Sequence, residues 1–233
     1  LHDLTMLRFA RAGRLPKIIH SIRMVGYRML LKASVRMAKA VIVPTEFVKD
    51  EVVRYVPLNA RKVTVTLEAS EQPIKVPAKP IDTINKPFVL YVGSAFPHKN
   101  LEGLIKAYEV IRQTNPELNL VLAGKKEYYY KKLEASVGKQ HALKNKVVFT
   151  GFVADAELKW LYELAEAYVF PSFSEGFGLP GLEAMVHGCP VVSSNATCLP
   201  DVYGDAAHYF DPKNSEDMAA KILEVISDKN LRE

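Results

Sequence analysis

Short apolar runs alternate with amphipathic segments through the second half of this chain, and this alternation is the feature that most constrains its fold. Apolar residues in the intervening segments recur at the helical period, as Leu101, Leu104 and Ile105 do. Asn100 and Asp155 are placed to cap two of these helices. Near-continuous apolar strands separated by helices are typical of a parallel sheet covered on both faces. We therefore predict a doubly wound, Rossmann-like α/β domain over residues 86–233. Its six strands are expected at residues 87–93, 118–124, 146–151, 167–172, 190–194 and 207–210.

The preceding residues predict a second, smaller α/β unit. Residues 40–45 form an apolar run, Thr45 is placed to cap a helix over 46–56, and an alternating strand follows at 62–69. The stretch 70–87 contains four prolines and has no sustained period, which is typical of a linker. The predicted organisation is a partial N-terminal domain over 1–70, a linker over 71–85 and the larger domain from residue 86.

Charge is concentrated at the start of the chain. Residues 1–40 contain nine Lys or Arg against Asp3 alone, a net charge of +8 in a chain whose total is +5. Basic residues interleaved with apolar ones favour an anionic partner, and we expect residues 1–40 to contact an anionic membrane surface. The alternative is a solvated face of long side chains. Nucleic acid is not expected as a partner.

Two further observations concern location. Cys189 and Cys198 are the only cysteines, too few for a disulfide framework, which favours a reducing cytoplasm. No apolar run approaches the roughly 20 residues that span a bilayer. The expected location is cytoplasmic and peripheral at the inner face of the membrane.

Ligands of a doubly wound sheet bind at the carboxyl ends of its strands, near the point where strand order reverses. Three glycine-containing loops follow such ends: "GSAFPHKN", "GFVADAE" and "PSFSEGFGLPG". In the third loop Pro180 suits the first position of a helix, whose free amides attract a phosphate. Glu175 and Glu183 flank this turn, and carboxylates beside a phosphate have neutral hydroxyls as their natural partners. A nucleotide sugar, with a diphosphate between two hydroxyl-rich sugars, satisfies both kinds of group.

Three blocks in a fixed order carry a family resemblance. "YVGSAFPHKNLEGLIKAY", "GFVADAEL" and "SEGFGLPGLEAMVHGCPVVSS", the last with the E-x7-E spacing of Glu175 and Glu183, resemble the retaining GT-B glycosyltransferases of family 4. The resemblance covers nearly all of residues 40–228. It implies a GT-B fold and metal-independent transfer of a hexose from a nucleoside diphosphate sugar to an acceptor hydroxyl, with retention of configuration. It implies no cofactor beyond the donor substrate.

The same resemblance assigns roles to individual residues. Glu175 matches the glutamate that contacts donor sugar hydroxyls, Glu183 the one that holds the ribose, and Lys99 the cation that stabilises the leaving diphosphate. His2, within "LHDLTMLRF", matches a histidine that faces the donor across the cleft, so the expected catalytic residues are Glu175, Lys99 and His2. Ser94 stands where many members have arginine, which leaves more of the charge to Lys99. The remaining donor-binding positions are Gly93, Ser94, Gly151, Phe152, Val153, Gly176, Phe177, Gly178 and Leu179.

The resemblance also bears on the extent of the sequence and on the identity of the donor and acceptor. Much of the N-terminal acceptor domain and a final crossing helix are expected to lie outside this sequence, and the acceptor is expected to be a carbohydrate or lipid-linked. "PHKN" is similar to the mannosyltransferase-like branch and implies GDP-mannose as donor. Two alternatives stay open: a nucleotide-sugar-binding half that is inactive without a complementing acceptor domain, and a GT-B sugar-nucleotide epimerase.

Plainer interpretations compete with these roles. Glu175 and Glu183 also suit a solvated loop and a first helical turn, where a carboxylate is favourable. His187, Cys189 and Cys198 suggest a metal site, but their spacing fits no common zinc pattern, and the chain has no D-x-D. No metal site is predicted.

Overall fold

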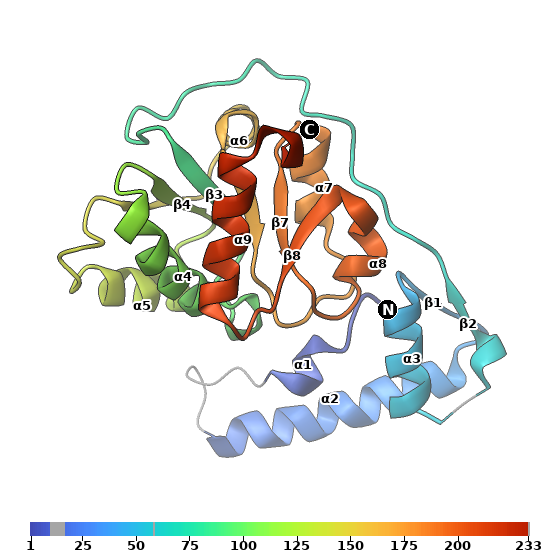
Figure 1. The fold of residues 1–233 in the computed structure, drawn as a ribbon. Coiled ribbons are helices and arrows are strands. Elements are labelled where there is room, and N and C mark those ends of the chain that lie inside the picture. The colour runs from blue at the N-terminus through green and yellow to red at the C-terminus, as the bar shows by residue number, and fades with distance from the viewer. Residues whose placement is uncertain (10–16, 58, 233) are drawn as a thin grey trace.

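A parallel sheet of six strands organises most of the chain. The computed structural model describes residues 1–9, 17–57 and 59–232, and Figure 1 shows their arrangement. The strand order is β5-β4-β3-β6-β7-β8 with all neighbours parallel, so strand order reverses between β3 and β6. The strands are β3 (Phe88–Val92), β4 (Asn119–Ala123), β5 (Val147–Gly151), β6 (Ala167–Phe170), β7 (Val191–Ser194) and β8 (Ala207–Phe210). The predicted doubly wound sheet is confirmed, and each predicted strand is present.

Helices cover this sheet on both faces. Right-handed crossovers place the helices after β3 and β4 on one face and those after β6 and β7 on the other. The helices are α4 (Leu101–Thr114), α5 (Tyr128–Val137), α6 (Asp155–Leu164), α7 (Leu179–Val186), α8 (Leu199–Tyr203) and α9 (Ser215–Ser227). Helix α9 packs beside α4, the helix that follows β3, on the same face of the sheet (Figure 1). Short 3-10 turns occur at η1 (Ala60–Lys62), η2 (Pro97–Lys99), η3 (Gly204–Ala206) and η4 (Lys229–Leu231).

A second, two-stranded parallel sheet lies in the N-terminal part. Its strands are β1 (Val41–Val43) and β2 (Val63–Val65), and the accompanying helices are α1 (Thr5–Arg8), α2 (Lys17–Met37) and α3 (Glu46–Tyr55). Its apolar core, which includes Val43, Val48 and Val52, is separate from the core of the large sheet. Between β2 and β3 the chain runs as an extended segment along the outside of the large sheet (Figure 1). The division into domains at residues 70 and 85 stays a prediction.

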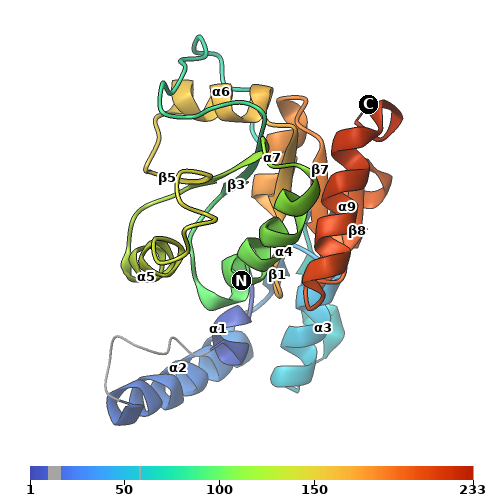
Figure 2. The same cartoon turned by 60° about the vertical axis from the view of Figure 1, so that its left-hand side comes forward.

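Helix α2 is the most exposed long element. Among its residues 18–37, only Leu31 and Val35 are buried, and Figure 2 shows the helix apart from the large sheet. Its exposed apolar side chains include Ile18, Ile22, Val25 and Met29. In the part of the chain that the structure describes, no helix is long and apolar enough to span a bilayer.

Helix starts test the capping predictions. Thr45 caps α3 as expected, because its Oγ1 accepts a hydrogen bond from the Val48 N–H at 3.2 Å. Asn100 occupies the N-cap position of α4, but the prediction that it caps the helix is wrong. Its side-chain amide donates instead to the carbonyls of Pro171 and Pro212, at 3.0 and 2.8 Å, and so joins loops that follow β6 and β8. These bonds turn the Asn100 amide toward the two carbonyls, and its left-handed backbone, with φ of 55°, differs from the extended conformation of a capping residue.

Two other expected helix starts shift by one residue. Asp155 was expected to cap α6, whereas Ala154 is the N-cap residue and Glu157 accepts from its N–H at 3.2 Å. Gly178 is the N-cap of α7, so Pro180 is its second residue and not its first. Proline is tolerated there too, because the early N–H groups of a helix have no partner within it.

Candidate functional site

A partly buried ion pair joins the loops that follow the two central strands. Lys99 ends η2 after β3, and Glu175 lies in the loop after β6. Lys99 Nζ is 2.6 Å from Glu175 Oε1, and the two side chains are only 17 and 13% exposed. The ammonium also lies 5.5 Å from the centre of the Phe170 ring. The reversal of strand order thus brings together two of the three predicted catalytic residues at the place where doubly wound folds bind ligands.

Glu183 lies on α7, and its carboxylate has a different partner. The Tyr162 hydroxyl donates to Glu183 Oε2 at 3.3 Å. Tyr162 is fully buried, and burial raises the pKa of its phenol well above the ordinary value, so the group stays a protonated donor. The two glutamates of the E-x7-E spacing are therefore held by different groups, Glu175 by a cation and Glu183 by a neutral hydroxyl.

The glycine-containing turn before α7 depends on the absence of side chains. A Cβ at Gly176 would collide with the His2 carbonyl oxygen, so the N-terminal segment passes directly against the turn. Gly178 has φ of +111°, which disfavours other residues. The Tyr203 hydroxyl donates to the Gly178 carbonyl at 2.5 Å, and a Cβ at Gly178 would meet this ring. Tight contacts with Tyr203 and the N-terminal segment thus set the shape of the turn.

Three buried tyrosines hold the start of the loop after β3. Tyr168, Tyr130 and Tyr91 donate their hydroxyls to the carbonyls of the successive residues 92, 93 and 94, at 3.2, 3.0 and 2.7 Å. Burial raises the pKa of each phenol, which keeps all three protonated as donors. These hydrogen bonds fix the backbone of Gly93 and Ser94 from two strands, β3 and β6, and from helix α5.

A cavity of about 590 Å³ opens at the carboxyl ends of β3, β4 and β5. Gly93, Ser94, Phe152 and Val153 of the predicted donor-binding residues line it together. Gly151, Lys99 and both glutamates lie outside its lining. Lys125 also lines it, with Nζ 6.0 Å from the centre of the Phe152 ring. Lys125 is absent from the predicted donor-binding residues, although the basic "KK" directly after Gly124 is a signal for it.

His2 reaches the site through its backbone. Its carbonyl lies against Gly176, but its ring points elsewhere: Nδ1 is 2.7 Å from Glu68 Oε1, and the side chain is 86% exposed. Thr5 Oγ1 lies 3.4 Å from Ser174 Oγ, and Thr45 Oγ1 donates to the Gly176 carbonyl at 3.1 Å. The N-terminal part thus packs on the loop that carries Glu175. The ligand roles of His2 and of the other site residues stay predictions.

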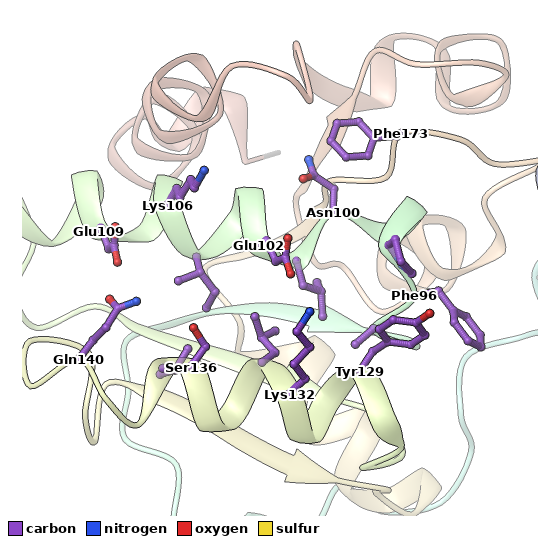
Figure 3. Close-up of a pocket in the computed structure, with 16 residues that line it drawn as sticks. Phe96, Asn100, Glu102, Lys106, Glu109, Tyr129, Lys132, Ser136, Gln140 and Phe173 are labelled. Atoms are coloured by element: carbon purple, nitrogen blue, oxygen red, sulfur yellow. The ribbon is translucent and has the colours of Figure 1, made fainter. Parts of the chain in front are cut away.

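A second groove, of about 530 Å³, runs between α4 and α5. Figure 3 shows Lys132 between the two helices and the rings of Phe96, Tyr129 and Phe173 at one end. Phe96 and Tyr129 also line the cavity beside Gly93, so the two hollows adjoin. None of the predicted site residues lines this groove.

The three residues that suggested a metal site have other partners. Burial raises the pKa of the Cys189 and Cys198 thiols to about 12, and the Cys198 Sγ lies 3.4 Å from the Glu175 carbonyl oxygen. His187 hydrogen-bonds to backbone groups through both ring nitrogens. Among the residues that the structure describes, no group of three His, Cys, Asp or Glu side chains is arranged to hold a metal ion.

Comparison with known proteins yields relatives in sequence and in structure. A family model described as "Glycosyl transferases group 1" matches residues 77–233. The chain is 35% identical over 212 residues to O-antigen chain mannosyltransferase B of Escherichia coli, a match that covers 87% of this chain and 55% of that protein. It is 32% identical over 204 residues to O-antigen chain mannosyltransferase RfbU of Salmonella typhimurium, covering 88 and 56%. The chain thus spans about half the length of these curated relatives.

Solved structures share the fold at low sequence identity. The crystal structure of TarM aligns with a TM-score of 0.74 at 18% identity and covers 99% of this chain and 43% of that one. Sucrose-phosphate synthase from Thermosynechococcus elongatus aligns with a TM-score of 0.74 at 23% identity, covering 99 and 60%. These likenesses confirm the predicted GT-B type of fold.

Proposed function

Because the chain belongs to the family of glycosyl transferases group 1, we propose that it forms the donor-binding part of an enzyme that transfers a hexose from a nucleoside diphosphate sugar to an acceptor hydroxyl, with retention of configuration and without a metal ion. The names of the two O-antigen mannosyltransferase relatives support mannose as the hexose. We propose GDP-mannose as the donor. We propose a carbohydrate or lipid-linked molecule as the acceptor.

One observation carries the proposal: Lys99 and Glu175 meet at the reversal of strand order, 2.6 Å apart and largely shielded from water. A cation at this place suits a diphosphate, and the neighbouring carboxylate suits sugar hydroxyls. Glu183 lies within the first two turns of α7, the helix that follows the Glu175 loop, where it suits the ribose hydroxyls. The cavity lined by Gly93, Ser94 and Phe152 has room for the nucleobase.

Catalysis in this proposal rests on stabilising the departing diphosphate. The Lys99 ammonium neutralises the negative charge that develops on the leaving oxygen, and the backbone amides of the turn before α7 add to it. The Glu175 carboxylate holds sugar hydroxyls and stabilises the positive charge that the sugar ring gains in the transition state. His2 lies in the segment that passes against Gly176, on the side from which the N-terminal part approaches the donor.

A second candidate function follows from the length of the chain relative to its curated relatives. Since the chain spans about half of its curated relatives, it is a candidate nucleotide-sugar-binding half that transfers nothing until an acceptor domain complements it. Such a half would bind a nucleoside diphosphate as tightly as the whole enzyme does. Hexose transfer after addition of the missing acceptor portion distinguishes this candidate from an epimerase, which needs no acceptor.

We also propose that residues 1–40 contact an anionic membrane surface from the cytoplasmic side. Support comes from their net charge of +8 and from the exposed apolar side chains of α2. A basic helix with exposed apolar residues binds such surfaces through charge attraction and shallow insertion.

Replacing Lys99 by Ala tests the donor site directly. The change removes a charge-assisted contact with the diphosphate and should weaken GDP binding by roughly 1.5 to 3 kcal/mol. Isothermal titration calorimetry on the 233-residue chain measures this affinity. Lys221→Ala is the matched control, because Lys221 pairs with Glu224 on α9 and not with either site loop. Unchanged GDP affinity in Lys99→Ala would remove Lys99 from the site, and an absence of GDP and UDP binding to the unaltered chain would contradict the proposed function.

A further inference from the structure

The ribose-side carboxylate, Glu183, is connected to the interdomain segment through two side chains without an assigned role. We propose that Tyr162 and His187 are positioning residues that orient the Glu183 carboxylate toward the ribose hydroxyls and tie this orientation to the linker at Ile74. The inference rests on the proposed function, because it presumes that Glu183 binds a ribose.

Tyr162 acts on the carboxylate itself. Its hydroxyl donates to Glu183 Oε2 at 3.3 Å from α6, a neighbouring helix, so the contact fixes the carboxylate from outside its own element. The ring is fully buried and packs edge-on against Tyr168 at 6.0 Å between centroids, which leaves the hydroxyl little freedom. One carboxylate oxygen is thereby occupied, and the other is left for a ligand.

His187 acts on the backbone of the same glutamate. The Ile74 N–H donates to His187 Nε2 at 3.0 Å, which makes Nε2 an acceptor and leaves the ring proton on Nδ1. The protonated Nδ1 then donates to the Glu183 carbonyl oxygen, 2.7 Å away. The imidazole also stacks on the Tyr162 ring, with centroids 5.3 Å apart and planes inclined by 22°. His187 therefore contacts the linker, the Glu183 backbone and the residue that holds the Glu183 carboxylate.

This arrangement links the linker to nucleotide recognition. The segment from residue 71 to 85 joins the two parts of the chain, and Ile74 lies in it without a helix or strand to hold it. A displacement of the linker that breaks the Ile74 hydrogen bond leaves the imidazole with the Glu183 carbonyl as its one hydrogen-bond partner in this network and weakens its stacking on the Tyr162 ring. The orientation of Glu183, and hence the preference for a ribose, then depends on where the linker lies.

Tyr162→Phe tests the first contact, because it deletes the hydroxyl and keeps the ring. We expect GDP to bind about 5- to 10-fold more weakly, because the Glu183 carboxylate is no longer held in place beforehand and must be ordered when the ribose binds. The preference for GDP over 2′-deoxy-GDP should shrink by a similar factor, whereas the affinity for inorganic pyrophosphate, which has no ribose, should not change. Calorimetry on the 233-residue chain measures all three affinities. A general loss of packing cannot produce this selective pattern.

The matched control is Tyr108→Phe, which removes the hydroxyl of an equally buried tyrosine that donates to the carbonyls of Leu118 and Lys146. It should leave the preference for GDP over 2′-deoxy-GDP unchanged. If Tyr162→Phe binds GDP but retains the full preference, the inference is overturned while the proposed function stands. If the unaltered chain binds neither GDP nor UDP, the proposed function fails first.

His187→Phe tests the connection to the linker, because it keeps an aromatic ring against Tyr162 and removes both hydrogen bonds. Hydrogen–deuterium exchange should accelerate at the Ile74 amide, and the preference for GDP over 2′-deoxy-GDP should fall. His141→Phe, a change at an exposed histidine outside this network, should do neither. Faster exchange at Ile74 together with an unchanged preference would disprove the coupling.

Discussion

At the residue scale, the two carboxylates of the E-x7-E spacing differ in what holds them. Glu175 pairs with the Lys99 ammonium at 2.6 Å, whereas Glu183 accepts from the Tyr162 hydroxyl at 3.3 Å. A pair that is largely shielded from water couples its members strongly, so removing either changes what the other can do. In the proposed donor site this coupling affects the transferred sugar and the diphosphate, and not the ribose.

Glu175→Gln should therefore lower turnover without weakening nucleotide binding. Loss of the charge should lower kcat of the full-length enzyme by roughly 10²-fold, because the carboxylate stabilises the transition state more than the ground state. GDP affinity of the 233-residue chain should not fall, since Lys99 loses a competing partner. Glu183→Ala serves as the comparison and should weaken GDP binding. Equal losses of GDP affinity in both variants would contradict the division of roles.

At the element scale, α2 differs from every helix of the large sheet. Those helices bury an apolar face against strands, whereas α2 exposes Ile18, Ile22, Val25 and Met29 beside exposed Arg23 and Arg28. Exposed apolar residues at helical spacing mark a surface suited to another partner. This is the structural basis for the proposed membrane contact.

Sedimentation with lipid vesicles tests this contact. The chain should bind vesicles rich in anionic lipid and should dissociate as salt is added, because the attraction is screened. Arg23→Glu combined with Arg28→Glu should reduce binding strongly. Lys139→Glu combined with Lys144→Glu changes the net charge equally at exposed positions outside α2 and should reduce it much less. Equal binding to neutral vesicles would contradict the electrostatic account.

At the scale of the whole molecule, buried ionisable groups make stability depend on pH. Burial raises the pKa of Cys189 and Cys198 from 9.0, and that of Tyr108 from 10.0, in each case to about 12. A raised pKa in the folded protein means that unfolding favours proton release at high pH. The stabilisation is therefore complete below about pH 9 and is lost as the pH rises toward 12.

Urea unfolding at pH 7.5 and pH 10 should show this decline. Each buried thiol should remove up to ~1.4 kcal/mol of unfolding free energy per pH unit above pH 9, in addition to the contribution of the tyrosines. Cys189→Ala lacks one of these groups, so its stability should fall less steeply over the same interval. Identical slopes for the variant and the unaltered chain would exclude Cys189 as a contributor.

Local patterns sufficed to predict most elements. Each of the six strands appears within two residues of its expected bounds, and Thr45 caps α3, because periodicity and N-cap chemistry act over a few neighbouring residues. The Asn100 prediction failed for the complementary reason. Its side chain has carbonyl acceptors 71 and 112 positions away, which no local pattern reveals.

The sequence by itself determined the alternation of strands and helices, the glycine turn before α7 and the spacing of Glu175 and Glu183. Only the tertiary structure decided that Lys99 meets Glu175 across 76 positions, and that Tyr162 and His187 connect Glu183 to Ile74. The physical reason is that the order of strands in the sheet determines which loops lie next to each other. Hydrophobic periodicity along the chain specifies each element, but contacts between loops exist only after the sheet has assembled.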